Sequence, residues 1–378
     1  MASIYLHIPF CKQACHYCDF HFSTSLKHKE ALVDALCKEL ELRKTELPVQ
    51  VENIYFGGGT PSLLSKQNLE QIFEHIYKNY KVVAHPEITL EANPDDITKE
   101  KLKAFKSCGI NRLSLGIQSF FEEDLKLMNR AHNEEQAIQS LEEVKNHFEN
   151  YSIDLIYGIP NMGFLRWEAN LMKALEYDVP HLSCYALTVE PHTALEKFIE
   201  KEIIEPVDDE LADTHFKFLY DLLTRKGYQH YEFSNFGKPG YFSQNNMAYW
   251  TGKPYLGIGP SAHSYNGSDL RTWTIKNNIK YIKSIGSNKL PISTETLTKT
   301  DRYNEHVMTR LRLQEGIDLD EILQKYGQSY FEYFMLQIQP HLDAERLDLY
   351  KNHVSVRPEA KFLSDGIAAD LFKIEFDS

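Results

Sequence analysis

Three cysteines near the amino end, Cys11, Cys15 and Cys18, lie within eight consecutive residues of the stretch HIPFCKQACHYCDF. A structural zinc site usually has four protein ligands and a disulfide uses two cysteines, so neither accounts for a set of three. The C-x3-C-x2-C spacing lets three thiolates converge on one cuboidal 4Fe–4S cluster, whose fourth iron stays open to a small molecule. The spacing therefore predicts an iron–sulfur cluster whose missing ligand is a substrate or cofactor.

Two other interpretations of the cysteine loop stay open. His16 or His21 can complete a Cys3His zinc site, and the three thiols can be structural residues that cluster by chance. The remaining cysteines, Cys37, Cys108 and Cys184, are scattered singly within apolar patterns, which predicts small buried residues. Such sparse cysteine usage is typical of a reducing compartment, where clustered thiols remain available as ligands.

The elements that position this loop follow from an alternation of short apolar runs with stretches of helical period between residues 3 and about 203. Because Cys11 follows the first run, the loop lies at the carboxyl end of the first strand, where an α/β barrel carries its active site. Six repeats of this length favour parallel strands in a barrel or part of one, with a doubly wound open sheet as the alternative. The runs are IYLHI from 4, VENIYF from 51, EITLEA from 87, NRLSLGI from 111, SIDLIYG from 152 and HLSCYAL from 181.

Local signals support several helices between these runs. Thr98 and Asn133 precede acidic residues, as N-caps do, and Gly109 ends the stretch LKAFKSCG as a helix C-cap. The helix around residues 29–44 places Glu39 on a face that is otherwise mostly apolar.

The composition of the chain changes after residues 205–227, whose apolar residues have the period of one long helix. Residues 228–267 are rich in Gly, Asn, Tyr and Pro, which is typical of a segment of loops and strands that extends or covers a barrel. Beyond the polar stretch 294–302, NEHVMTRLRL and LDEILQKYG predict helices and LDLYKNHVSVRP predicts a hairpin. We therefore expect three parts: a barrel over 1–232, an extension over 233–293 and a C-terminal domain over 294–378.

The stretch YLHIPFCKQACHYCDF resembles the cluster loop of the radical S-adenosylmethionine (SAM) superfamily, in the branch of the oxygen-independent coproporphyrinogen III oxidases and the HemW haem chaperones. Eight further segments match this branch in order: YFGGGTPS, LEANPD, RLSLGIQSF, DLIYGIP, YEFSNFGKPG, NMAYW, GIGPSAHSY and VMTRLRLQEGI. The resemblance implies a partial (β/α)6 barrel with a loop- and strand-rich extension and a small, mainly helical, HemN-like C-terminal domain. It also implies that the three cysteines hold the cluster, that the open iron chelates SAM, and that SAM cleavage yields a 5′-deoxyadenosyl radical.

The resemblance also assigns SAM contacts to this sequence. In GGGTPS the glycines lack side chains, so backbone N–H groups can approach a ligand, although a tight strand–helix turn explains them equally well. By resemblance this loop meets the SAM amino group, Tyr5 lies near SAM or substrate, and Tyr17 is an aromatic residue of the cluster loop. Four further residues are implied to contact the ribose, methionyl and adenine parts of SAM. The complete set of expected SAM contacts is Tyr5, Tyr17, Gly58, Gly59, Thr60, Glu91, Gln118, Arg130 and Asp154.

Two departures distinguish the members of the branch. The dehydrogenase has a further cysteine where this chain has Phe20, and a long extension before its cluster loop. Both features favour a haem chaperone that passes haem to acceptor proteins, with coproporphyrinogen III oxidation by decarboxylation as the alternative and a zinc-stabilised interaction protein as a third class. HemW members typically have histidine where this chain has Asn245, and asparagine is not a usual haem ligand. The expected haem contacts are Asn245, Tyr249, Trp250 and His263, and His230 is a further histidine of the region.

The bulk composition limits the partners. The net charge of −13 argues against general nucleic-acid binding, which requires a basic face. The sequence has no apolar stretch near the ~18 residues of a membrane span, and MASIYLHIPF does not have the pattern of a secretory signal. We therefore expect a cytoplasmic protein. Peripheral contact with a membrane surface stays open. Its expected partners are haem acceptors and a reductant such as a flavodoxin or ferredoxin.

Overall fold

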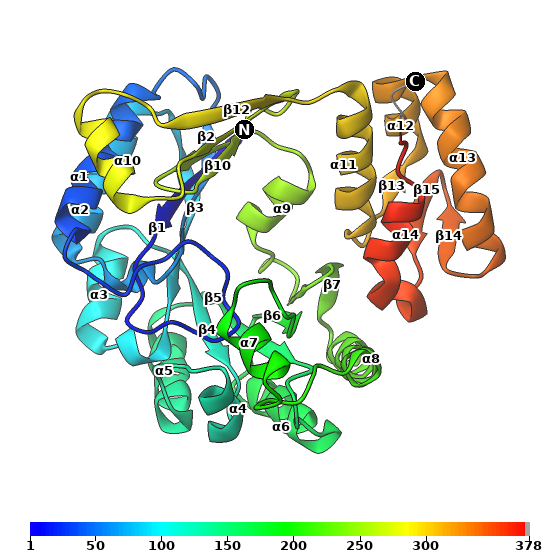
Figure 1. The fold of residues 1–378 in the computed structure, drawn as a ribbon, viewed down its shortest axis with the longest axis horizontal. Helices are drawn as coiled ribbons and strands as arrows, with labels where there is room; N and C mark the ends of the chain where they lie inside the picture. The colour runs from blue at the N-terminus through cyan, green and yellow to red at the C-terminus, as the bar shows by residue number, and fades with distance from the viewer. Residues whose placement is uncertain (375–378) are drawn as a thin grey trace.

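The computed structural model describes residues 1–374, so the last four residues of the predicted C-terminal domain, 375–378, lie outside the described residues. Its main feature is a 12-stranded sheet with the order β12-β11-β10-β9-β1-β2-β3-β4-β5-β6-β8-β7 (Figure 1). The central six strands follow chain order and are all parallel, which is the winding of a barrel and not of a doubly wound sheet. The sheet stays open at β12 and β7, so the predicted partial barrel is confirmed.

The strand–helix repeats arise from the apolar runs seen in the sequence. The strands are β1 (Ala2–Ile8), β2 (Val51–Gly58), β3 (Val82–Ala92), β4 (Arg112–Gln118), β5 (Asn150–Tyr157) and β6 (His181–Ala186). The helices that follow them are α1 (Lys29–Leu42), α2 (Lys66–Asn79), α3 (Lys99–Ser107), α4 (Glu122–Leu127), α5 (Glu134–His147), α6 (Phe164–Glu176), α7 (Ala194–Glu200) and α8 (Asp209–Arg225). The short 3-10 helices η1 (Pro61–Leu63) and η2 (Pro94–Asp96) follow β2 and β3.

The predicted caps are confirmed. The Thr98 side chain accepts a hydrogen bond from Lys101 N, and Asn133 forms a capping box with Gln136. Gly109 has φ +95° directly after the end of α3. Of the three scattered cysteines, Cys37 and Cys184 are buried as expected, whereas Cys108 is partly exposed because it lies at the end of α3.

The segment after α8 extends the sheet at both edges, as its composition predicts. The hairpin β7 (Gln229–Glu232) and β8 (Asn235–Gly237) pairs antiparallel with β6. The chain then forms α9 (Gln244–Trp250), which packs against β1 and β2, and reaches β1 from its other side as β9 (Tyr255–Ile258). The remaining elements of this edge are β10 (His263–Tyr265), β11 (Leu270–Thr274), α10 (Asn278–Gly286) and β12 (Ile292–Thr296).

The C-terminal helices form a separate lobe beside the sheet (Figure 1), with a hydrophobic core of its own between Tyr303 and Leu371. The predicted hairpin is present as β14 and β15. Because β12 still belongs to the large sheet, the predicted boundary at 294 falls within a strand, and the three-part division remains our proposal. The elements are α11 (Lys299–Leu311), β13 (Ile317–Asp318), α12 (Leu319–Tyr326), α13 (Gln328–Asp343), β14 (Leu347–Tyr350), β15 (His353–Val356), η3 (Pro358–Leu363) and α14 (Ser364–Asp370).

A buried ion pair fastens the β9–β12 edge to α1. Glu39 and Arg43, 0% and 1% exposed, lie one turn apart with Oε1 and Nη1 3.0 Å apart. Arg43 also donates to the Gly257 carbonyl at 2.8 Å and to Ser264 Oγ at 3.0 Å. The second Glu39 oxygen accepts from Tyr281 Oη of α10 at 2.6 Å and from the backbone N–H of residue 259 at 2.9 Å. Arg43 Nε and Nη2 also donate to the Glu46 carboxylate, at 3.0 and 2.8 Å. Every polar atom of the pair therefore has a partner, from the extension or from α1 and the turn after it, which is what a buried pair needs to be tolerated.

Among residues 1–374 no helix is both long and apolar enough to span a bilayer.

Candidate functional site

The cysteine loop joins β1 to α1 and is fixed at both ends and in the middle. Cys11 N donates to the Ser23 carbonyl at 3.1 Å, and Ser23 N donates back to the Pro9 carbonyl at 2.9 Å. Further along, the Gln13 amide donates to Asn129 Oδ1 at 2.8 Å, and Asn129 donates to the Ala14 carbonyl at 2.7 Å. The loop is thereby held against the turn after α4.

The three thiols are free and close to one another. Burial, reinforced by the other two thiols, raises the pKa of Cys18 to about 11. Burial also raises the pKa of Cys11, although a hydrogen bond with Thr60 opposes the shift. Arg130 Nη1 donates to Cys15 Sγ at 3.3 Å. Three partly buried, free thiols beside one guanidinium are a donor set that fits an iron–sulfur cluster.

The geometry does not favour the mononuclear zinc alternative. Within residues 1–374, no group of three His, Cys, Asp or Glu side chains converges closely enough for one metal ion. His16 Nδ1 hydrogen-bonds the Leu127 carbonyl at 2.8 Å, and its ring packs edge-on against Phe198. His21 Nε2 is engaged by Asn278 Oδ1 at 2.7 Å. Both histidines proposed as the fourth zinc ligand therefore serve to anchor the loop.

The glycine loop after β2 is built for close backbone contact with β1. A Cβ on Gly59 would lie 2.6 Å from the Phe10 carbonyl oxygen, and a Cβ on Gly58, which has φ +106°, would lie 2.6 Å from the His7 ring. The N–H groups of Gly58, Gly59 and Thr60 donate to the Glu91 carboxylate and to two β1-loop carbonyls. The expectation that these N–H groups face a ligand is thus not met.

Glu91, at the end of β3, lies between the glycine loop and two tyrosines. Its carboxylate accepts from Tyr55 Oη at 2.8 Å and from Gly58 N at 3.2 Å. Burial raises the pKa of Glu91 to about 7, with the Tyr55 hydrogen bond opposing the shift and the charge of Asp154 adding to it. Tyr5 stacks on Tyr55 with ring centroids 6.1 Å apart. These contacts hold the Glu91 carboxylate at the carboxyl end of β3, beside the glycine loop.

Arg130 links the ends of β3 and β4 to the cysteine loop. Its Nη2 donates to Asn93 Oδ1 at 2.7 Å and to the Gly116 carbonyl at 2.9 Å, and its Nη1 lies 3.4 Å from Tyr17 Oη. Gln118, with φ +65°, aims its amide at the same place, because a Cβ on Gly116 would meet both side chains. The geometry thus brings Tyr17, Gln118 and Arg130 together.

Asp154, on β5, faces the interior of the barrel. Burial raises its pKa to about 6, against hydrogen bonds from Ser183 and Ser114. Next to it, Tyr185 of β6 keeps 42% of its surface exposed although β6 is an internal strand of the sheet. Tyr185 interacts with the charges of Asp154 and Glu232, and the Trp250 indole hydrogen-bonds Glu232. The barrel therefore contains an open interior walled by acidic and aromatic side chains.

The four expected haem contacts do not form one patch. Tyr249 lies over the β1–β2 side, where burial raises its pKa and Tyr255 and Glu91 add to the shift. Its ring packs edge-on against Tyr255, with centroids 4.6 Å apart. Trp250 faces the other side of α9, with Arg312 5.3 Å from its ring. Asn245 is only 3% exposed, at the start of α9. His263 is exposed on β10 and stacks on Trp273.

His230 is a core residue. Its ring stacks on Phe236 at 4.3 Å, its Nε2 is bonded to the Phe233 carbonyl at 2.9 Å, and burial lowers its pKa to about 3.

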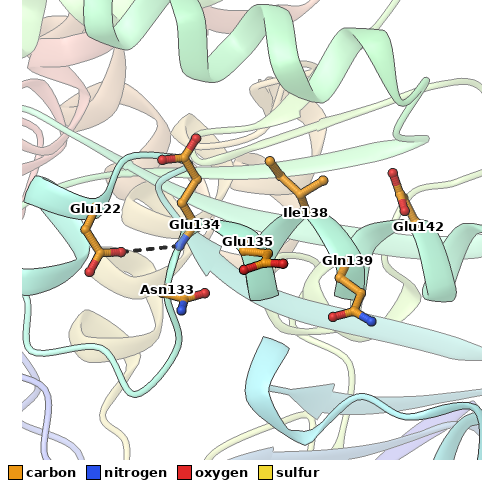
Figure 2. A pocket seen from close by; sticks show the side chains of 7 residues that line it. All are labelled: Glu122, Asn133, Glu134, Glu135, Ile138, Gln139 and Glu142. Carbon is orange, nitrogen blue, oxygen red and sulfur yellow. Dashed lines mark hydrogen bonds between the residues drawn. The ribbon is translucent and has the colours of Figure 1, made fainter.

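A second hollow lies on the outer surface between the start of α4 and α5 (Figure 2). Four glutamates, an asparagine, a glutamine and Ile138 line it, and Glu134 N donates to the Glu122 carboxylate. None of its lining residues belongs to the expected site, and its acidic lining makes it unsuited to an anionic cofactor.

Comparisons with known proteins identify the family. The radical SAM superfamily model matches residues 5–169, and the HemN C-terminal domain model matches residues 297–363. The heme chaperone HemW of Lactococcus lactis is 34% identical over 339 residues, covering 89% of this chain and 88% of the relative. HemW of Escherichia coli is 34% identical over 337 residues, covering 86% of each chain. The chain belongs to the HemW family.

HemW proteins share their fold with a solved radical SAM enzyme. Coproporphyrinogen III oxidase (HemN) of Escherichia coli superposes on this chain with a TM-score of 0.84 at 25% identity, over 98% of this chain and 90% of that one. Membership of the superfamily implies a 4Fe–4S cluster and SAM.

Sequence reasoning did not identify several residues of this HemW-family site. Asn93 bridges Thr60 Oγ1 and Arg130, and it lies inside the LEANPD segment, where its position beside Glu91 was the available signal. Tyr55 lies inside the apolar run VENIYF, where its hydroxyl group was the available signal. Tyr185 carries no local signal, because only the strand register shows that it faces the interior.

Proposed function

We propose that this protein is a haem chaperone that binds a 4Fe–4S cluster, SAM and haem and transfers haem to acceptor proteins. The main support is that curated relatives at 34% identity over most of the chain are named heme chaperone HemW. The structural observation that carries it is the trio of free thiols beside Arg130, above an open interior.

Cys11, Cys15 and Cys18 would hold three irons of the cluster. When bound, the cluster supplies an open iron for SAM chelation and an electron for SAM cleavage. The raised pKa values of Cys11 and Cys18 favour this assignment, because a thiolate bound to a cationic group no longer bears the desolvation cost that raises the pKa.

SAM would lie between the glycine loop and the Arg130 side of the mouth. Glu91 offers its ammonium group a carboxylate that is already oriented by Tyr55 and Gly58 N. Arg130 and Gln118 suit its carboxylate from the opposite side. Asp154 and Tyr5 complete the set from the interior, and Tyr17 and Thr60 support the cysteine loop and its neighbour Asn93.

Haem would contact the aromatic residues around α9 and the β9–β11 edge. Tyr249 and His263 offer a flat and a ligating side chain on the side of α9 that faces β9, and Trp250 offers a second flat ring on the opposite side of the helix. The buried Asn245 orders α9 through its hydrogen bond to Tyr249.

The test is anaerobic reconstitution followed by titration with haem. We expect about four irons per chain, a spectral change on addition of SAM, a Soret band that saturates near one haem per chain, and transfer of that haem to an apo-acceptor. A reconstituted protein that binds no haem contradicts the chaperone function.

Oxygen-independent coproporphyrinogen III oxidation is the second candidate. It is supported by the HemN-like fold and by the open interior lined by Tyr185 and Asp154. Anaerobic incubation with coproporphyrinogen III, SAM and dithionite separates the two functions. Release of carbon dioxide over repeated catalytic cycles would establish the oxidase activity. We expect no such release.

The partners we propose are haem-accepting proteins and a flavodoxin- or ferredoxin-like reductant in the cytoplasm. The net charge of −13 disfavours nucleic acid, and contact with a membrane surface would be peripheral.

A further inference from the structure

The β9–β11 edge has two distinct faces. Ser264 and Thr272 point toward α1, where both hydroxyl oxygens meet Arg43. Because side chains alternate along a strand, the residues directly before and after Ser264 and Thr272 point to the opposite, inner face of the sheet. There Tyr265 lies across from Arg271, and His263 lies across from Trp273.

The inner face continues the wall of the barrel interior. Tyr5 of β1 is in register with Gly257 of β9, and a Cβ on Gly257 would lie within 2.0 Å of the His263 backbone oxygen. The missing side chain at Gly257 therefore allows β10 to cross close to β9 at the level of Tyr5. His263 and Trp273 lie at this level, on the same inner face.

His263 differs from the other histidines near the interior and its mouth. It is exposed, and within residues 1–374 no hydrogen bond to its ring nitrogens is present, whereas Nε2 of His7 and of His21 is engaged by a neighbouring oxygen. Stacking on Trp273, with ring centroids 5.9 Å apart at 24°, fixes the orientation of the His263 imidazole. A neutral imidazole with a free nitrogen and a fixed ring is a suitable axial ligand for haem iron.

The surroundings of His263 also suit a porphyrin. Tyr265 and Tyr255 provide apolar rings on the same face, with centroids 6.2 Å apart, and the Arg271 guanidinium lies beside them, paired with Glu305 at 2.8 Å. The chain after β11 reaches the cysteine loop, where Lys276 Nζ donates to the Asp19 carbonyl.

We propose that His263 is the protein ligand of the haem iron, with Trp273 orienting its ring and Arg271 facing a propionate. This inference rests on the proposed haem-chaperone function and names the site of its cargo. It places the haem on the inner face of β9–β11 and not at the start of α9, where Asn245 is buried and has no nitrogen that ligates iron. No bond other than the iron–nitrogen bond forms, and no electron is transferred.

The experiment titrates the full chain, with its cluster reconstituted, with ferric haem. His263→Ala should remove the resonance Raman and EPR signature of histidine ligation. It should also weaken haem binding by about 10- to 100-fold or more, because even indirect partners of metal ligands contribute that much. Imidazole added to His263→Ala should restore the signature. His85→Ala, which removes an exposed histidine of β3, is the matched control and should behave as wild type.

Asn245→His provides an independent arm. We expect it to give no gain in haem affinity and no new ligand signature, since residue 245 is buried. An unchanged spectrum and affinity in His263→Ala, or a gain in affinity in Asn245→His, would overturn the inference while haem binding by the wild type keeps the proposed function. A wild-type protein that binds no haem would overturn both.

Discussion

The Glu39–Arg43 pair allows a quantitative prediction, because it is the main polar connection between α1 and the β9–β11 edge. Arg43→Met removes the guanidinium and leaves a carboxylate that is 0% exposed with only Tyr281 Oη and a backbone N–H as partners. Breaking a buried pair in this way costs about 3–5 kcal/mol. With an m-value of about 3 kcal/mol/M, the urea midpoint should fall by roughly 1–1.7 M.

The control for this prediction lies on the same helix. Lys38 pairs with Glu41 at 3.4 Å, with side chains 42% and 34% exposed. Lys38→Ala should therefore cost about 0.5 kcal/mol or less. The double variant Glu39→Gln/Arg43→Met should lose about 0.5–3 kcal/mol less than the sum of the two single variants, because the two side chains interact directly.

Circular dichroism and tryptophan fluorescence would follow unfolding in urea. Trp273 lies on β11 and reports on the extension, while Trp167 is buried in the barrel. If Arg43→Met lost no more stability than Lys38→Ala, or if the double variant were simply additive, the assignment of the pair as the connection would be wrong.

Three further predictions follow from other sites. Cys15→Ala should lose the cluster after anaerobic reconstitution, since two thiolates remain; iron and sulfide analysis checks this, and a full complement of both would refute the ligand set. Gly59→Ala places a Cβ 2.6 Å from the Phe10 carbonyl oxygen and should cost about 1–3 kcal/mol in thermal unfolding, whereas Gly286→Ala, with open space around it, should not destabilise. Burial lowers the pKa of Lys361 to about 8, so the folded state binds fewer protons than the unfolded state between pH 8 and 10.5. The stability of wild type relative to Lys361→Met should therefore rise by about 3 kcal/mol across that window and stay level below it; equal pH profiles would contradict the shift.

The sequence predicted the parts of this protein that depend on local pattern. The apolar runs gave the six parallel strands, and the C-x3-C-x2-C spacing placed the cysteine loop after the first of them. Helical period even put Glu39 on the buried face of α1. The partners of the Glu39–Arg43 pair in the extension, Gly257, Ser264 and Tyr281, are more than 200 residues away and have no local signal. Such pairings depend on how the extension folds back.

The same limit explains the haem contacts. Asn245, Tyr249 and Trp250 are neighbours in sequence, yet one turn of helix points Tyr249 and Trp250 to opposite sides and buries Asn245. The expectation for the glycine loop failed for a different reason, since its composition cannot reveal that the adjacent strand already uses its N–H groups.

The hydrogen bonding of the glycine loop has a consequence for nucleotide discrimination. Loops that bind ATP or dinucleotides do so by directing several unpaired amides at a phosphate. At residues 58–60 those amides are already bonded to the Glu91 carboxylate and to carbonyl oxygens. A triphosphate would find no free amide at this position, so ATP in a cell should not compete with a sulfonium nucleoside for the mouth of the barrel.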